Sequence, residues 1–342
     1  MKTIRINSVS FRLHPRGVTV GGLCMLTLFL LGIHALSSGS YSIPVSQVYA
    51  SLSGHGEPGD DFIIGQVRLP RFLAALIAGL ALGIAGGIFQ QLTRNPLGSP
   101  DILGLTQGAS AGALSVIVFA SSSGPAAVAL GGIGGALLAG GLLYALAWKT
   151  GGDTYRLILV GIGIAAIAAG FTNFLLTRSD IYDASRAMLW LTGDLNGRDW
   201  EQVTALSLAL LLLVPLALST SRPLTMMGMG NDTAASLGVT INRTYWVALT
   251  SAALLTAGAV AVAGPLAFVA LTAPHLARWL TGSTAANLWS AGLMGGCVVV
   301  AADAVALAGI GGRQLPTGVV TGVVGGGYLI WLLIAQRRKG TL

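Results

Sequence analysis

Two arginines stand three residues apart in the sequence Arg-Leu-Pro-Arg, from Arg68 to Arg71, directly before a long apolar run. A proline is tolerated in the first turn of a helix, and residues at i and i+3 share one helix face. Guanidinium groups bind carboxylates through paired hydrogen bonds, so Arg68 and Arg71 are a candidate docking site for the acidic side chains of a partner. The competing interpretation is that both side chains only reach toward lipid headgroups.

Few other residues in the apolar segments could support chemistry. Asp303 and His275 come nearest to being ionisable groups inside a membrane, where such groups are costly and usually functional. His275 has no second histidine or Glu-x-x-His at ligand spacing, so we expect a helix that starts after Pro274, with His275 bonded to the backbone, rather than a metal site. Cys24 and Cys297 lack a Cys-x-x-Cys partner and are interpreted as buried apolar residues.

The sequence contains no Gly-x-x-x-x-Gly-Lys-Ser/Thr motif, so the chain has no phosphate loop of its own. If the protein is a transporter, its energy comes from an ion gradient or from another subunit. The scarcity of intramembrane ionisable residues argues against proton coupling. No Ser-His-Asp set or convergent carboxylate pair indicates an enzyme. An ion-coupled secondary transporter and a membrane enzyme are kept as alternatives.

The elements that position these residues are membrane helices. The 342 residues are 54% hydrophobic and 9% charged, with a mean hydropathy of +0.77, which a water-soluble core could not bury. A span needs about 20 mostly apolar residues. Ten segments qualify and predict an all-α polytopic bundle: 18–37, 71–92, 102–121, 125–147, 157–177, 201–219, 244–263, 265–281, 286–308 and 315–335. We therefore expect an N-terminal segment (1–17), a membrane domain (18–336) and a C-terminal tail (337–342).

The net charge of +7 is explained by membrane topology. The basic residues form no patch with interleaved aromatics, so no nucleic-acid partner is expected. With the N-terminus inside and ten crossings, the inner side receives 13 of the 19 basic residues. The outer side receives the other six: Arg68, Arg71, Arg178, Arg186, Arg198 and Arg313. This distribution obeys the positive-inside rule and places both termini in the cytoplasm.

Three connections between the spans are informative. The outer segment 37–62 contains Val45, Val48 and Leu52 at the spacing of a short interfacial helix. Asn95-Pro96 breaks the helix between two spans and predicts a fixed turn at the inner face.

The inner loop 222–243 is expected to contain a short helix, about 232–237, with Asn231 or Asp232 as its N-cap and Gly238 as its C-terminal cap. So short a helix is marginal in water, so it needs a docking surface.

Small residues crowd the spans. The stretches 131–141 and 318–327 repeat the small-xxx-small spacing that allows close helix packing. Residues 74–93 match 253–272 at a constant offset of 179, which suggests an inverted repeat of the kind found in transporters.

Several stretches resemble the iron-siderophore and vitamin B12 importer permeases, the ten-helix membrane subunits of type II ABC importers. These are Arg-Leu-Pro-Arg before its Gly/Ala-rich span, Asn-Pro-Leu-Gly-Ser-Pro-Asp-Ile-Leu-Gly, the segment 263–278, Gly-Asn-Asp-Thr-Ala-Ala-Ser-Leu-Gly-Val, and the last span from Leu315. The resemblance covers about residues 18–336. The stretches 153–166 and 193–200 are most similar to permeases for ferric enterobactin, a catecholate siderophore. A ferric hydroxamate, ferric citrate, haem or cobalamin importer is the alternative.

The resemblance implies roles for the residues singled out above. In this family a periplasmic binding protein docks through acidic residues on arginines that match Arg68 and Arg71. The family often has another arginine four residues after the aspartate of the ninth span. Here that residue is Leu307, and Arg313 is the candidate substitute.

The segment with Asn231, Asp232, Ala235, Leu237 and Gly238 matches the helix that sits in a cleft of the ATPase subunit. The implied partners are a sister permease in a heterodimer, two ATPase copies, the periplasmic binding protein and the ferric siderophore, in the bacterial inner membrane. No cofactor or metal site of the chain itself is implied.

Overall fold

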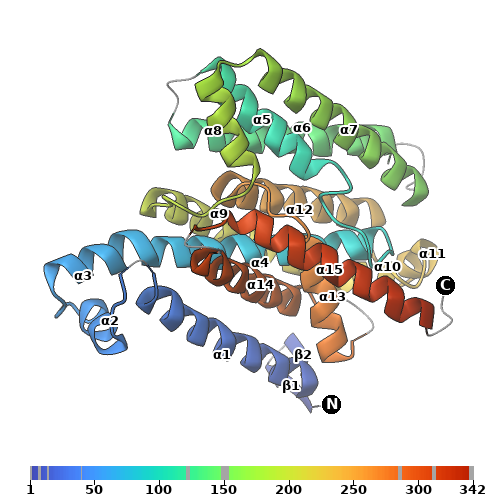
Figure 1. Ribbon diagram of the computed structural model, residues 1–342. Helices are drawn as coiled ribbons and strands as arrows, with labels where there is room; N and C mark the ends of the chain where they lie inside the picture. The colour runs from blue at the N-terminus through green and yellow to red at the C-terminus, as the bar shows by residue number, and fades with distance from the viewer. Residues whose placement is uncertain are drawn as a thin grey trace.

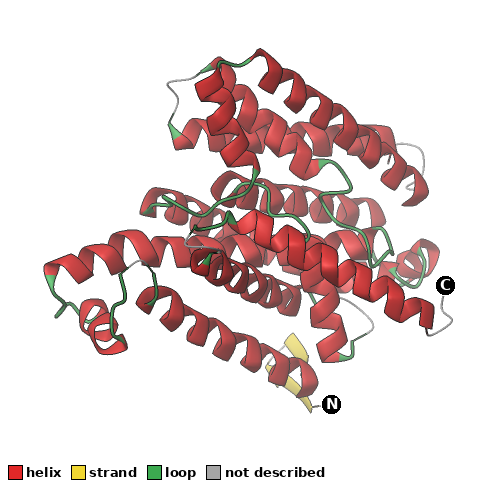
Figure 2. Ribbon diagram, in the orientation of Figure 1, coloured by secondary structure: helices red, strands yellow, loops and turns green. Residues whose placement is uncertain are grey.

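A computed structural model describes residues 2–6, 9–13, 15–39, 41–120, 124–147, 154–283, 287–309 and 313–338. Nearly all regular structure in these residues is helical, which confirms the predicted helical membrane domain (Figure 1, Figure 2). The exception is an antiparallel hairpin of β1 (Lys2–Ile6) and β2 (Val9–Leu13) before the first helix. This hairpin was not predicted, because alternation over five residues is a weak strand signal.

Each of the ten predicted spans contains one helix with shifted boundaries. These helices are α1 (Pro15–Ser37), α4 (Leu69–Leu92), α5 (Leu105–Phe119), α6 (Pro125–Ala147), α7 (Thr154–Arg178), α9 (Trp200–Ser219), α12 (Ile241–Ala263), α13 (Val269–Thr281), α14 (Leu288–Ala308) and α15 (Thr317–Arg338). Seven helical stretches in the described residues are long and apolar enough to cross a membrane, and α5 and most of α15 form shorter apolar helices. With 13 residues, α13 extends only about 20 Å. The non-helical residues 264–268 before it must complete that crossing of the bilayer.

Shorter helices connect the spans. They are α2 (Val45–Leu52), α3 (Pro58–Phe62), α8 (Ile181–Leu191), α10 (Ser221–Met227) and α11 (Asn231–Ser236). The predicted helix near Val45 is confirmed, whereas α3, α8 and α10 were not predicted. The hairpin, the last turns of α15, and α11 lie toward one end of the bundle, and α2 and α3 lie at the opposite end (Figure 1). We call these the inner end and the outer end. Residues 339–342 of the predicted tail lie outside the described residues.

The helix that carries Arg68 and Arg71 starts earlier than predicted. A π-helix, η1 (Ile63–Arg68), joins α3 to α4 in one helical stretch from residue 58 to residue 92. Pro70 lies in the first turn of α4 as predicted, but it has no N–H to offer the preceding turn. A wider helical turn before it accommodates the missing bond. The indole Nε1 of Trp200 donates to the Gly65 carbonyl over 2.8 Å and satisfies one acceptor of this turn.

Helix α4 is the centre of the bundle and packs against α12, α13 and α14. Gly79 and Gly83 lie against the backbone of α14, where a Cβ on Gly79 would come within 2.4 Å of the Gly295 carbonyl oxygen. In the same way Gly131 and Gly135 of α6 cross Gly112 and its neighbours in α5. The close packing predicted from the glycines in 131–141 is confirmed. In 318–327 it holds for part of the stretch, because Gly322, Gly326 and Gly327 have open space around them.

Two predictions for the segment that contains α12 and α13 are wrong. Helix α13 begins at Val269, so Pro274 lies inside it and does not start it. Pro274 cannot donate to the carbonyl of Ala270, four residues earlier. That carbonyl faces Gly86 of α4, where a Cβ would lie 1.7 Å from it.

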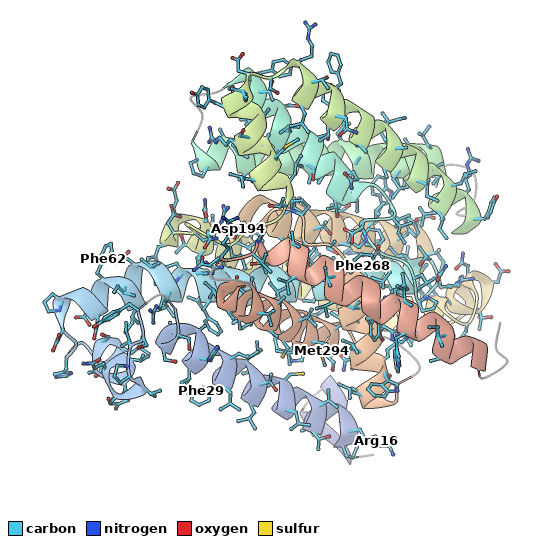
Figure 3. All side chains as sticks on the ribbon, viewed as in Figure 1. Arg16, Phe29, Phe62, Asp194, Phe268 and Met294 are labelled. Atoms are coloured by element: carbon cyan, nitrogen blue, oxygen red, sulfur yellow. The ribbon has the colours of Figure 1, made fainter. Side chains whose placement is uncertain are left out.

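The register of the suggested repeat is also not preserved. The offset of 179 pairs Phe89, which is buried within α4, with Phe268, which has a left-handed φ of 64° in the break before α13 (Figure 3). The two segments run in opposite directions, but only one of them is a continuous helix.

Candidate functional site

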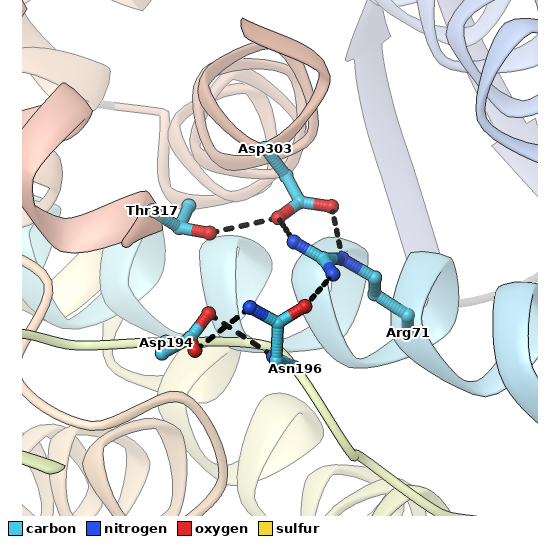
Figure 4. A network of polar contacts seen from close by, with 5 residues as sticks. All are labelled: Arg71, Asp194, Asn196, Asp303 and Thr317. Atoms are coloured by element: carbon cyan, nitrogen blue, oxygen red, sulfur yellow. Dashed lines mark hydrogen bonds and ion pairs between the residues drawn. The ribbon is translucent and has the colours of Figure 1, made fainter. Parts of the chain in front are cut away.

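Arg71 is held in a buried ion pair at the outer end of the bundle (Figure 4). Its Nε and Nη2 donate to the two carboxylate oxygens of Asp303 in α14, each over 2.9 Å. The side chains are 12% and 6% exposed. Asp303 is thus the internal partner of an arginine predicted to dock a partner protein, and its role was not predicted. Two-point pairing of this kind is strong and fixes the orientation of both groups.

The ion pair belongs to a network that joins four segments. The Thr317 hydroxyl, at the start of α15, donates to Asp303 Oδ1 over 2.7 Å. The third guanidinium nitrogen, Nη1 of Arg71, donates to Asn196 Oδ1, and Asn196 in turn donates to Asp194. The network therefore ties α4, α14, α15 and the segment between α8 and α9 together.

Arg68 is also bonded within the chain. Its Nη1 donates to the carbonyl of Leu36 at the end of α1 over 2.6 Å, and its Nη2 donates to the carbonyl of Tyr41. Both arginines nevertheless line one hollow of about 340 Å³ at the outer end, together with Asp303. The expectation that they lie on one face is confirmed, and neither guanidinium is free of partners in the described residues.

Arg313 lies beside this hollow. It is exposed and lines a neighbouring hollow of about 320 Å³, which shares Leu307 and Gln314 with the first one. The position of the family arginine, Leu307, and its candidate substitute therefore open onto the same part of the outer end.

At the inner end, α11 projects its last turn outward. Ala235 and Gly238 are exposed, Leu237 is 59% exposed, and Ala234 is buried. Gly238 has a φ of 87°, which confirms the C-terminal cap glycine. An exposed leucine at the tip of a six-residue helix is the kind of surface that a partner covers.

The predicted N-cap of α11 is wrong. The cap is Gly230, without a side-chain hydrogen bond, and Asp232 lies exposed in the first turn. The side chain of Asn231 instead accepts a hydrogen bond of 2.6 Å from Arg94. Arg94 belongs to the turn between α4 and α5, so this bond joins α11 to that turn. Its φ of 47° places it in the left-handed region, which non-glycine residues rarely adopt.

The turn after α4 is fixed as predicted. The Asn95 side chain accepts from the Leu97 N–H over 2.9 Å, and the Gly98 N–H donates to the Asn95 carbonyl over 3.0 Å. Pro96 follows within this turn and prevents helix continuation.

His275 contacts a side chain and not a capping backbone group. Its Nδ1 is hydrogen bonded to the hydroxyl of Tyr328 in α15. One turn later, Arg278 donates to Gln90 Oε1 over 2.7 Å, and Gln90 donates to the Leu271 carbonyl over 3.0 Å. These bonds connect α13 to α4 and α15.

A polar hollow of about 660 Å³ lies between α5, α7, α13 and α15. Its lining includes Asp101, Gln107, Thr172 and Asn173, and the buried Thr172 hydroxyl has no partner among the described residues. Asp101 accepts from Thr106 over 2.6 Å. Burial raises the pKa of Asp101, an effect partly opposed by hydrogen bonds from Thr106 and the Phe268 backbone. The sequence gave little sign of this hollow, because its polar residues are scattered over distant segments.

Comparison with known proteins shows extensive similarity. A family model for the FecCD transport family matches residues 25–335. The ferric enterobactin transport system permease protein FepG of Escherichia coli strain K12 is 41% identical over 308 residues, which are 90% of this chain and 93% of that protein. FepD, another ferric enterobactin permease of the same strain, is 36% identical and covers 95% and 97% of the two chains. The Fe(3+) dicitrate permease FecD, also of that strain, is 35% identical, with coverage of 91% and 98%.

The fold is similar to a solved structure. A metal-chelate type ABC transporter in an inward-facing conformation superimposes with a TM-score of 0.83 and 26% identity, covering 93% of this chain and 99% of that one. The helices described above therefore have the arrangement of an ABC transporter membrane subunit.

Proposed function

Because the chain belongs to the FecCD transport family, a family of multi-pass membrane permeases, we propose that it carries a ferric catecholate siderophore, ferric enterobactin, from the periplasm to the cytoplasm. The observation that carries this proposal is the 41% identity to FepG over 90% of the chain. Similarity to FecD is the reason that ferric citrate, a ferric hydroxamate, haem and cobalamin are tested beside it.

The importer would contain a sister permease in a heterodimer, two ATPase copies and a periplasmic binding protein, in the bacterial inner membrane. The similarity to both FepG and FepD, two permeases of one named transport system, supports two different permeases. The inner end would face the cytoplasm, with both termini and α11 there, in agreement with the positive-inside distribution. ATP would be hydrolysed by the partner, since the chain carries no phosphate loop.

The outer hollow is the proposed docking site for acidic side chains of the binding protein. Arg68 and Arg71 line it, and Arg313 lies beside it. A carboxylate entering the hollow would meet guanidinium groups that already hold internal acceptors, so docking would require exchange of partners. The exposed face of α11, with Leu237 at its tip, is the proposed contact with the ATPase.

The function is tested by iron uptake. Cells that lack this gene and redundant importers, but retain the other three components, are given radiolabelled ferric enterobactin, a ferric hydroxamate or ferric citrate. Restoration of ferric enterobactin uptake by the gene is expected. Restoration with a different complex alone would overturn the cargo and keep the importer, and uptake that survives inactivation of the ATPase would overturn the ABC mechanism.

The docking site is tested by charge reversal. Replacing Arg71 alone by glutamate would set two carboxylates together at Asp303, so its reversal is combined as Arg71→Glu with Asp303→Arg, which keeps an internal pair. Arg68→Glu with Arg313→Glu tests the rest of the site. Each pair is expected to abolish docking of the binding protein while insertion persists, and restored docking is expected with a binding protein of reversed charge. Normal docking by both pairs would refute the site.

Coupling is tested at the tip of α11. Leu237→Asp is expected to weaken ATPase association and to abolish stimulation of hydrolysis by docking. Thr225→Asp places the same charge on the exposed surface of α10 and is the control. Equal loss in both variants would indicate a general effect of charge at the inner end and not a contact made by α11.

A further inference from the structure

A second hollow at the outer end is not used by the docking site. Its volume is about 480 Å³. It lies among the outer ends of α5, α6 and α12, helix α8, and the segment that joins α8 to α9, near Asp194 in Figure 3. Ile117, Val128, Leu189 and Trp190 give it apolar and aromatic walls. Arg186 and Arg198 also line it.

Arg198 is incompletely satisfied in this hollow. Its Nε is shielded from solvent and has no hydrogen-bond partner among the described residues. Its Nη1 makes one long bond, 3.4 Å, to Gln202 Oε1. Burial lowers the pKa of Arg198, and the charges of Asp194 and Asp199 oppose that effect. A buried guanidinium with an unpaired N–H is costly, and an anionic oxygen is the acceptor that best relieves the cost.

The neighbouring carboxylates have other hydrogen bonds to accept. Asp194 receives the backbone N–H and the side-chain amide of Asn196. Asp199 caps α9 by accepting from the Gln202 N–H over 3.0 Å. Among the described residues that line the hollow, the two arginines face Asp194 as the carboxylate. An anion can therefore approach Arg198 without displacing an ion pair seen in the described structure.

The walls narrow the class of anion. Trp190 and its apolar neighbours offer a surface for a flat ring, and arginine favours planar oxygen acceptors and aromatic faces. An aliphatic carboxylate from a protein would use the guanidinium alone and leave the aromatic wall without a matching group. An aromatic ring with adjacent anionic oxygens would use both.

We propose that this hollow is an outer binding site for one catecholate arm of the cargo, with its oxygens on Arg198 and its ring against Trp190. The proposal rests on the proposed function and adds a site of contact between permease and cargo. It places this contact on the segment that also carries Asn196, the residue bonded to Arg71, so cargo and docking partner would act on one loop.

The test uses the whole importer, with sister permease and ATPase, in lipid nanodiscs. Equilibrium binding of the radiolabelled iron complex of 2,3-dihydroxybenzoate is measured without the binding protein, and uptake of ferric enterobactin is measured in cells. Arg198→Gln and Trp190→Leu are each expected to weaken binding roughly ten-fold and to raise the half-saturating uptake concentration in proportion, as loss of a charge-assisted bond or of a ring contact would. Arg198→Lys, which keeps the charge without the planar fork, should fall between Arg198→Gln and the parent.

Arg178→Gln, an exposed arginine at the end of α7, is the matched control and should bind like the parent. ATPase stimulation by the loaded binding protein reports folding and docking, and should be unchanged in every variant. Unchanged binding and uptake in both Arg198→Gln and Trp190→Leu would overturn the site and leave the proposed function intact. A parent importer that transports no ferric catecholate would overturn the proposed function and this site together.

Discussion

At the scale of residues, the central observation is that the two arginines expected to contact a partner are bonded inside the chain. A buried ion pair is weak evidence of stabilisation, but removing one member leaves an uncompensated charge and costs about 3–5 kcal/mol. Arg71 and Asp303 are such a pair. Arg71 therefore has a structural role that is separate from any docking role, and the two roles can be tested separately.

We expect Asp303→Asn to lower the free energy of unfolding by several times more than Thr317→Val, which removes one hydroxyl donor worth about 1 kcal/mol. Replacing both partners, as Arg71→Met with Asp303→Leu, should recover much of the stability and still fail to dock the binding protein. The measurement is unfolding in detergent together with a docking assay. Equal stability of Asp303→Asn and the parent would show that the pair is not structurally important.

Asp101 predicts a pH dependence. Its pKa is raised in the folded protein, so on raising the pH the unfolded chain loses its proton first, and the folded state binds more protons across that interval. This contribution to stability is fully present below the unfolded pKa of about 3.9 and is lost as the pH rises through the folded value. We expect Asp101→Asn to flatten the decline and to be more stable than the parent at neutral pH. Thermal unfolding across pH checks this, with exposed Asp232→Asn as the control. Parallel curves for parent and Asp101→Asn would contradict it.

At the scale of elements, glycines set the distance between helices at the centre of the bundle. Ten helical segments could be located from their hydropathy, because a lipid-embedded helix needs a continuous apolar run. The π-turn before Pro70 and the position of Pro274 inside α13 could not be predicted in this way. In both places neighbouring segments accommodate the effect of the proline, by a Trp200 hydrogen bond and by the close approach of Gly86.

Gly86→Ala should therefore be severely destabilising, because its Cβ would lie 1.7 Å from the Ala270 carbonyl oxygen. Overpacking of this kind typically costs about 1–3 kcal/mol, and here a backbone atom would have to move. Gly134→Ala in α6, where nothing lies within 4 Å, is the control and should be neutral or slightly stabilising. Recovery of folded protein from detergent extracts and thermal unfolding provide the measurement. Similar behaviour of the two variants would mean that α4 and α13 can separate at little cost.

At the scale of the whole molecule, the chain leaves a polar surface at membrane depth. The hollow between α5, α7, α13 and α15 is lined by Gln107, Thr172 and Asn173, and such groups are not left facing lipid. A second membrane subunit placed on α7 and α15 would cover it and enclose a path between the two subunits. The docking hollow, this hollow and α11 would then follow one another from the outer end to the inner end.

This arrangement predicts selective protection of α7. Ile162 of α7 and Leu26 of α1 are 52% and 54% exposed. Each is changed to cysteine in a chain whose native Cys24 and Cys297 are replaced by alanine, and labelled with a lipid-soluble thiol reagent. In the chain alone both should react, whereas co-expression with the sister permease should protect Ile162→Cys and leave Leu26→Cys reactive. Protection of neither, or of both, would contradict pairing through α7.

The sequence by itself determined the membrane class, the ten apolar segments, the positions of the inner turn and the short inner helix, and the family. These follow from local composition and from short contiguous motifs, which need no knowledge of distant contacts. Only the tertiary structure decided what each polar residue touches. Arg71 and Asp303 are separated by 232 positions, and Arg94 and Asn231 by 137. Such pairs form only when packed helices place two distant groups within hydrogen-bonding distance, and no periodicity in a single segment carries that information.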